Sequence, residues 1–271
     1  MAGKDGIPEL VSLNVSAWSL KARFALKYHH VTYRTTPYLP LFGEFKLRLR
    51  LWEWRRKLTV PVMFTPKDGV LMQSYDIAQW ADRHSARPDA VRLFPEGKEA
   101  EVSSWNAKSD AVLFLGRAAL VESLLADPAE LRQQVPPSLR WLGPLGVALM
   151  TAIARRLRDK YRAEATSTTM DKALEVLREA QAALRAPGTV GADGERHLVG
   201  GALSYADMAV AVAVAAVKPL GPPYSNKARP PMKEFLPYQE EFADLVAWRD
   251  ALFAKYFPVD SDRRTGKSKS S

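Results

Sequence analysis

The stretch NVSAWSLKARFALK, residues 14–27, places two serines, Ser16 and Ser19, where a short apolar strand changes into a basic helix. Residues 10–14 have the composition of a strand, and the apolar residues that follow recur at helical spacing as far as His29. A helix that begins at the end of a strand presents unpaired backbone N–H groups and the positive end of its dipole. This junction therefore predicts a site that favours a bound negative charge.

The rest of the first third of the chain alternates strand and helix patterns. A mixed apolar and basic segment, 41–58, favours a helix whose ends the pattern does not define, and part of it is equally consistent with irregular structure. The sequence Lys-Asp-Gly at 67–69 is typical of a hairpin turn. The expected order is β-α-β-α-β-β-α, with further strands at 31–36, 60–64 and 70–72 and a closing helix at 74–84.

Everything after about residue 97 has the pattern of successive helices. They are expected at 97–125, 144–164, 168–186, 204–218 and 237–255, separated by proline-rich segments. The fold class is thus α/β plus all-α, with one domain at 1–86 and a second at 97–258. The tail, 259–271, is basic and almost without apolar residues, so we expect it to be disordered.

Composition limits the chemistry that the chain can perform. There is no cysteine, which excludes disulfides and protein thiols, and the four histidines lack the spacing of a zinc site, so no metal is expected. The longest apolar segment, 141–154, is too short for the ~20 residues of a membrane span. The first residues lack the apolar core of a signal peptide, which predicts a cytoplasmic location.

Three local patterns, in a fixed order, carry a resemblance to a known family. They are SAWSLKAR at 16–23, the series Val60-Pro61, Asp68-Gly69 and Gln73-Ser74, and LSYAD at 203–207. Together they resemble the cytosolic glutathione S-transferase superfamily of the serine type. The resemblance implies a thioredoxin-like N-terminal domain that binds glutathione, followed by a helical-bundle C-terminal domain.

The resemblance implies that Ser16 is the catalytic residue. Its hydroxyl would donate a hydrogen bond to the sulfur of bound glutathione, and the helix N-terminus would favour the thiolate over the thiol. The alternative is that Ser16 or Ser19 only caps the helix. For Ser19 we favour a cap or another structural role in the first helical turn.

The resemblance also implies the residues that bind the glutathione backbone. The Val60-Pro61 bond would be cis, so that the N–H and C=O of Val60 pair with the ligand; a trans proline that starts a strand is the alternative. Ser74 would cap the next helix and, with Gln73, bind the γ-glutamyl carboxylate. The family's basic residue before Val-Pro is replaced here by Thr59, so the basic segment 46–57 receives no residue-by-residue assignment.

Two further groups of residues have expected roles. Ser204 and Asp207 have the spacing of a capping box at the start of a very apolar helix, which indicates a structural role. By resemblance, Trp18, Trp105 and Phe114 line a pocket for the electrophile, although aromatic residues of this kind are also typical of a plain core. The segment 128–160 is a lid, a partner surface or a membrane-surface helix, and we favour the first two.

The expected function is transfer of glutathione to a small hydrophobic electrophile, with a role in detoxification and, as the family implies, a homodimer. Isomerisation, peroxide reduction and dehalogenation remain open, whereas the absence of cysteine disfavours thiol-reductase chemistry. The alternative is a non-catalytic scaffold with the same fold, which binds a ligand or a protein partner. The formal charge of +9 does not indicate nucleic-acid binding, because the basic residues are spread along the chain and into the tail.

Overall fold

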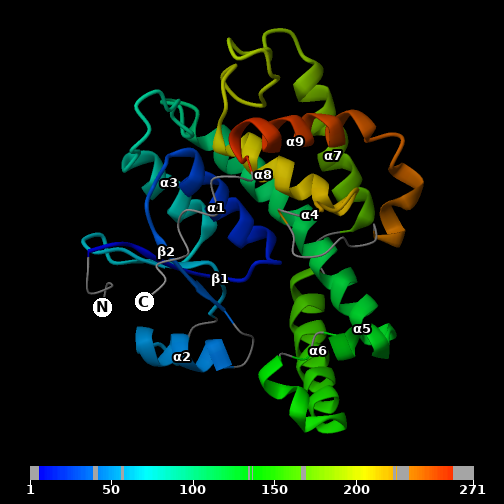
Figure 1. The fold of residues 1–271 in the computed structure, drawn as a ribbon. Coiled ribbons are helices and arrows are strands. Elements are labelled where there is room, and N and C mark those ends of the chain that lie inside the picture. Colours follow the sequence, from blue (N-terminus) through cyan, green and yellow to red (C-terminus); the bar gives the residue numbers. More distant parts are fainter. Residues whose placement is uncertain are drawn as a thin grey trace.

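The structure is a computed structural model that describes residues 6–38, 42–55, 58–133, 135, 137–165, 169–221, 224 and 232–258. The expected disordered tail at 259–271 lies outside these residues. The first unit contains a four-stranded sheet, and the described elements of the second are helices, apart from an isolated bridge between Val190 and Arg196 (Figure 1). This arrangement confirms the predicted fold class, a thioredoxin-like N-terminal domain followed by a helical C-terminal domain. The exact domain boundaries stay predictions.

The first unit has the predicted order of elements. It consists of β1 (Glu9–Ser12), α1 (Ala17–Tyr28), β2 (Arg34–Pro37), α2 (Phe42–Leu51), β3 (Val62–Phe64), β4 (Val70–Leu71) and α3 (Ser74–Arg83). The strand order across the sheet is β2-β1-β3-β4. Strand β1 runs parallel to β2 and antiparallel to β3, and β3 and β4 form the hairpin that Gly69, with a φ of +77°, allows.

Alternation along the inner strands β1 and β3 buries side chains on both faces of the sheet. Leu10 and Met63 point to the face that packs on α1 and α3, where they join the large core. Val11, Val62 and Phe64 belong to a separate small core with Leu47 of α2. The sheet therefore lies between α1 and α3 on one side and α2 on the other.

The second unit is built on the long helix α4 (Glu99–Ala126). The other α-helices are α5 (Pro128–Gln133), α6 (Pro144–Ala165), α7 (Met170–Arg185), α8 (Tyr205–Ala213) and α9 (Ala243–Tyr256), and the 3₁₀ helices are η1 (Pro137–Leu142), η2 (Val214–Ala216) and η3 (Lys233–Tyr238). Every residue of α8 is buried, because it packs against both α4 and α1. Among the described helices, none is both long and apolar enough to span a bilayer.

Three predicted elements differ from the observed ones. Helix α2 ends at Leu51 instead of residue 58, because Trp52 leaves the helix with a φ of +52°. The predicted helix at 237–255 begins only at Ala243, since η3, which contains Pro237, occupies the preceding turns. The short helices α5 and η1 lie in a proline-containing segment, around residues 128–142, that we expected only to separate longer helices.

A buried lysine joins the two units. Lys21 of α1 has no exposed surface, and its Nζ lies 2.7 Å from Ser109 Oγ, 2.7 Å from Asp110 Oδ1 and 3.2 Å from Asn106 Oδ1 on α4. Burial lowers the pKa of Lys21, and the charge of Asp110 opposes this effect. These contacts fix the start of α1 against α4.

Candidate functional site

Ser16 lies where strand β1 has ended and helix α1 begins. It is the N-cap of α1, and its Oγ accepts a hydrogen bond from the backbone N–H of Ser19 at 3.4 Å. Its own N–H donates to Leu13 O at 2.9 Å, which fixes the turn between strand and helix. The side chain is half-buried, and its O–H has no acceptor among the described residues. The cap therefore uses the hydroxyl as an acceptor and leaves its proton available.

Ser19 faces the interior. It is fully buried, and its Oγ accepts a hydrogen bond from the N–H of Leu13 at 3.2 Å. A side chain in this position supports the turn before α1 and presents nothing to a ligand at the surface. The geometry agrees with the structural role that we favoured for this residue.

The Val60-Pro61 peptide bond is cis and precedes strand β3. Among the described residues, neither the N–H nor the C=O of the half-buried Val60 has a hydrogen-bond partner, so this backbone is free to pair with an extended ligand. The register places Val11 opposite Val62, so Ser12 at the end of β1 lies beside Pro61. The Ser12 hydroxyl is buried and has no partner in the described part of the chain.

Sequence reasoning missed Ser12. A serine at the end of an otherwise apolar strand was visible in the sequence, but the pattern alone does not say that its side chain is buried. An unpaired buried hydroxyl costs free energy. Ser12, beside the cis bond, is therefore a further candidate residue of the same site.

Helix α3 does not begin as predicted. Gln73 is its N-cap, with an exposed side chain that makes no capping hydrogen bond. Ser74 is already the first helical residue, so its predicted role as the cap is wrong. Its side chain is buried and lies beside the phenol of Tyr205 from α8. Burial raises the pKa of Tyr205, the neighbouring Ser74 opposes that rise, and the buried Tyr205 hydroxyl has no hydrogen-bond partner in the described structure.

Two of the three aromatic residues proposed for an electrophile pocket meet. The rings of Trp18 on α1 and Phe114 on α4 are 5.3 Å apart, and the Arg117 guanidinium lies 4.7 Å and 5.1 Å from their centres. Trp18 is only two residues after Ser16. Trp105 belongs to the large core and lies more than two helical turns from Phe114, so we leave it out of the proposed pocket. The sequence analysis did not identify Arg117, although its spacing from Phe114 places it on the same helix face.

Two basic residues of α2 form ion pairs within the protein. Arg48 Nη2 pairs with Glu44 at 2.7 Å, and Arg50 Nη2 pairs with Glu9 at 2.7 Å while its guanidinium stacks on Phe64. The hydrogen bond from Arg50 lowers the pKa of Glu9. Lys57 lies outside the described residues. The geometry therefore adds no assignment for a second ligand carboxylate.

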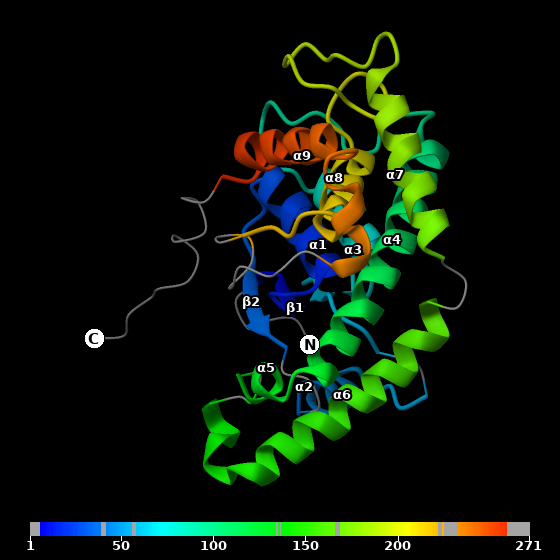
Figure 2. The same cartoon turned by 90° about the vertical axis from the view of Figure 1, so that its right-hand side faces the viewer.

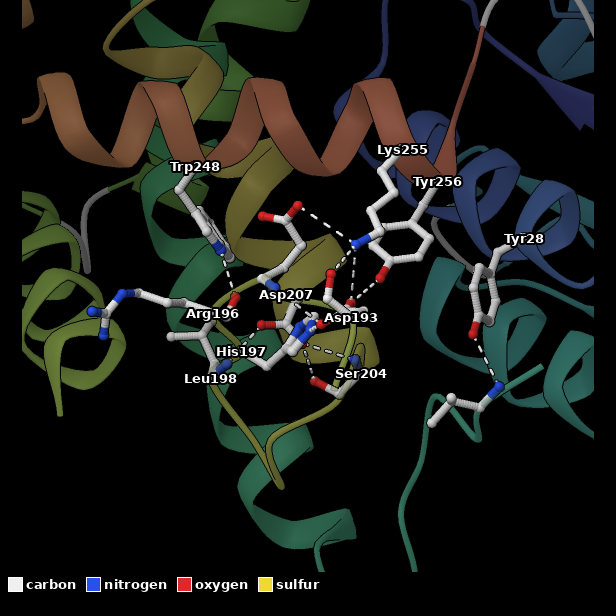
Figure 3. A network of polar contacts seen from close by, with 12 residues as sticks. Tyr28, Asp193, Arg196, His197, Leu198, Ser204, Asp207, Trp248, Lys255 and Tyr256 are labelled. Atoms are coloured by element: carbon white, nitrogen blue, oxygen red, sulfur yellow. Dashed lines mark hydrogen bonds and ion pairs between the residues drawn. The ribbon is translucent and has the colours of Figure 1, made fainter. Parts of the chain in front are cut away.

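Ser204 and Asp207 close the start of α8 (Figure 3). The Asp207 carboxylate has no exposed surface and accepts hydrogen bonds from Ser204 N at 2.8 Å, Ser204 Oγ at 2.7 Å and Leu198 N at 2.7 Å. The buried His197 lies between this carboxylate, at 3.7 Å, and Asp193, at 3.0 Å. The side chains of Ser204 and Asp207 therefore bond to groups of the protein itself.

Residues 15–84 match the family model of the glutathione S-transferase N-terminal domain. Among solved structures, glutathione transferase GSTFuA2 from Phanerochaete chrysosporium is 17% identical, with a TM-score of 0.57, and the match covers 92% of this chain and 98% of that one. A glutathione S-transferase from Methylobacillus flagellatus with glutathione bound is 15% identical, with a TM-score of 0.53, over 92% of this chain and 95% of that chain. No curated protein matches the chain in sequence.

The glutathione S-transferase of Ceriporiopsis subvermispora in complex with glutathione is 18% identical to this chain. Its TM-score is 0.52, and the match covers 97% of this chain and all of the other. At these identities the solved structures establish the fold, and the family model identifies the first domain. Residues 15–84 thus match the glutathione S-transferase N-terminal domain, and the chain as a whole has the two-domain fold of the glutathione transferases among these solved structures.

Proposed function

We propose that the chain binds glutathione, stabilises its thiolate with Ser16 and transfers it to a hydrophobic electrophile. The observation that carries the proposal is the half-buried Ser16 hydroxyl, which caps α1 as an acceptor while its proton has no acceptor in the described structure. A donor beside the N-terminus of a helix favours the charged form of a neighbouring thiol. The protein has no cysteine of its own, so the thiol must come from the ligand.

The binding surface for the peptide part of glutathione is the backbone at the cis bond. An extended ligand would pair with the free N–H and C=O of Val60. Ser12 adds a buried hydroxyl without a partner beside Pro61. The N-terminal amides of α3, after Gln73, would donate hydrogen bonds to the γ-glutamyl carboxylate.

In the reaction, the thiol loses its proton to solvent, and the thiolate attacks an electrophilic carbon. A carbon–sulfur bond forms, and the leaving group departs with the electron pair of its broken bond, or the pair moves into a conjugated acceptor. The aromatic pair of Trp18 and Phe114 would hold an apolar electrophile beside the thiolate. This arrangement supplies proximity and a lowered thiol pKa without a protein nucleophile.

A titration tests the proposal. Glutathione is titrated into the wild type and into Ser16→Ala by calorimetry, while the ultraviolet absorbance of the bound thiolate is recorded. We expect both proteins to bind glutathione and only the wild type to raise the thiolate signal at neutral pH. Thr169→Ala is the matched control, because Thr169 caps the remote helix α7 with the same kind of bond, from Lys172 N at 3.3 Å.

Two other results would favour different conclusions. Absence of binding at millimolar glutathione would remove the transferase proposal and favour a non-catalytic scaffold with this fold. Binding with an unchanged thiolate signal in Ser16→Ala would leave glutathione as the ligand and exclude Ser16 as the thiolate donor. A cytoplasmic homodimer completes the proposal, and light scattering on the purified chain tests its oligomeric state.

A further inference from the structure

Large apolar side chains are exposed mainly on two segments of the chain. One is α2 with the turn that follows it, and the other is η1 with the start of α6. Together they hold seven of the twelve large exposed apolar side chains in the described structure, namely Phe45, Leu49, Trp52, Trp54, Trp141, Leu145 and Leu149. Trp52 and Trp141 are the most exposed, at 78% and 80%. A group of exposed aromatic and leucine side chains of this size is typical of a binding surface.

The two segments lie at the same end of the molecule. In Figures 1 and 2, α2 and the start of α6 both lie at the lower end, away from α7, α8 and α9. We refer to the exposed side chains of residues 42–55 and 137–158 as the aromatic-basic surface.

The backbone at Trp52 has a conformation that is unusual for a bulky residue. Helix α2 ends in a Schellman motif, in which one residue adopts a left-handed conformation. Trp52 N donates to Leu49 O at 3.4 Å, and Glu53 N donates to Arg48 O at 3.1 Å. Trp52 is that residue, with a φ of +52°, at a position that glycine normally occupies. A bulky residue there is strained, so the helix end by itself does not favour tryptophan at this position.

The charge of this surface is strongly positive. Residues 42–55 and 137–158 contain eight basic and two acidic side chains. Lys46, Arg55, Arg140, Arg155 and Arg156 are all exposed. Of these, Lys46 and Arg155 make no ion pair with any described residue. A partner that fits this surface would be both anionic and able to accept tryptophan and leucine side chains.

A second copy of the chain fits this surface poorly. A two-fold interface places the same patch against itself, which would bring the basic residues of both copies together. An anionic bilayer satisfies both requirements, because tryptophan rings insert at the level of the headgroups while lysine and arginine meet the lipid phosphates.

We propose that the aromatic-basic surface, at α2 and at η1 with the start of α6, binds peripherally to anionic lipid bilayers. The inference does not depend on glutathione binding, since it uses none of the residues of the proposed active site. It differs from the lid or partner surface that the sequence favoured for residues 128–160, and it extends the surface to α2.

Flotation of the full-length protein with lipid vesicles tests the proposal. We expect binding to vesicles of phosphatidylcholine mixed with phosphatidylserine and much weaker binding to phosphatidylcholine alone. The double variant Trp52→Ser with Trp141→Ser is expected to bind at least about tenfold less tightly. The matched control, Val190→Ser with Leu236→Ser, removes exposed apolar side chains from outside the surface and is expected to bind like the wild type.

The electrostatic part has its own pair of variants. Lys46→Glu with Arg155→Glu is expected to abolish the preference for anionic vesicles, whereas Lys172→Glu with Lys233→Glu makes the same change of charge on other exposed positions and is expected to retain it. The basic residues at 259–271 are identical in all these proteins, so they do not contribute to the differences.

Trp52→Gly separates function from folding. Glycine relieves the left-handed strain, so the midpoint of urea unfolding is expected to rise while vesicle binding falls. A tryptophan kept only for packing would give a lower midpoint. The proposal is overturned if neither kind of vesicle binds, if the double tryptophan variant binds like the wild type, or if that variant instead dissociates a dimer in light scattering. Binding of nucleic acid in place of vesicles would also overturn it.

Discussion

Helices α1 and α8 both begin with a serine N-cap, and the two caps differ in whether the serine hydroxyl proton has an acceptor. At α8, the Asp207 carboxylate accepts three hydrogen bonds, and one of them comes from the Ser204 hydroxyl. At α1, Ser16 accepts one bond, and its proton has no acceptor in the described structure. The same residue type at the same helix position thus serves folding at one site and leaves a donor available at the other.

Burial accounts for the difference. Ser204 and Asp207 have no exposed surface, so every polar atom must find a partner inside the protein. Ser16 is half-buried and lies beyond the end of β1, where solvent or a ligand can complete its bonding. We call the buried cap of α8 the closed cap and the half-buried cap of α1 the open cap. We expect the closed cap to contribute mainly to stability and the open cap to contribute mainly to chemistry.

The closed cap gives the largest expected effect. Asp207→Ala leaves two buried N–H groups and a hydroxyl without an acceptor and removes a carboxylate beside His197, so it should lower the free energy of unfolding by about 3–5 kcal/mol. Urea unfolding followed by circular dichroism measures this. The control Asp171→Ala removes an exposed first-turn carboxylate from α7 and should cost less than about 1 kcal/mol. Equal losses in the two variants would show that closure at α8 is unimportant.

The open cap should respond in activity instead of stability. Ser16→Asp keeps a side-chain acceptor for Ser19 N but removes the hydroxyl donor, so the unfolding free energy should stay near that of the wild type. Turnover with glutathione and an electrophile should fall about 100-fold, as for the loss of one preorganised donor. Ser16→Ala should lose both activity and about 1 kcal/mol of stability. If Ser16→Asp retained full turnover, the hydroxyl would have no chemical role.

The order of elements in both units could be predicted because periodicity and turn residues carry it. The details that failed depend on contacts between distant segments or on a residue that is unusual at its position. The cap at α3 was assigned to Ser74 because a serine stands at the helix start, but its side chain turns inward against Tyr205 of the second unit. The end of α2 was missed because a tryptophan occupies the place where glycine would have signalled the end.

The candidate site shows the same division. The family motifs identified Ser16 and the cis bond at Pro61, since both lie within short segments. Ser12 and Arg117 were not found, because their relation to the site arises from strand pairing and from the packing of α1 on α4. Local sequence thus predicted the residues at turns, and tertiary packing decided the neighbours of those turns.

Lys21 links the open cap to the second unit and should give an intermediate effect. Lys21→Met keeps the length of the side chain but removes bonds to Asn106, Ser109 and Asp110. Because Asp110 is partly exposed, water can solvate its freed charge, and the cost should be about 1–3 kcal/mol of unfolding free energy. The control Lys98→Met breaks only an exposed pair with Glu101 and should cost less than about 1 kcal/mol. A neutral Lys21→Met would mean that apolar packing alone positions α1.

The smallest expected effect is a dependence of stability on pH at the closed cap. Burial alone would lower the pKa of His197, but the hydrogen bonds and charges of Asp207 and Asp193 outweigh it, so the pKa lies above the usual 6.5. Protonated His197 therefore stabilises the folded state fully below about pH 6.5, and this contribution is lost as the pH rises through the higher folded-state value. Hydrogen bonds from Tyr256 and His197 lower the pKa of Asp193, so its contribution persists in acid until well below the usual value of 3.8.

His197→Asn tests this dependence, because asparagine retains hydrogen bonding and cannot take up the charge. The difference in unfolding free energy between wild type and variant, measured by urea unfolding from pH 5 to 9, should shrink as the pH rises. Lys255 of α9 lies 3.6 Å from Asp193 and is the same residue in both proteins, so it does not account for a difference between them. A constant difference over the whole range would show that His197 is neutral in the folded state and that its protonation does not contribute to the stability of this cap.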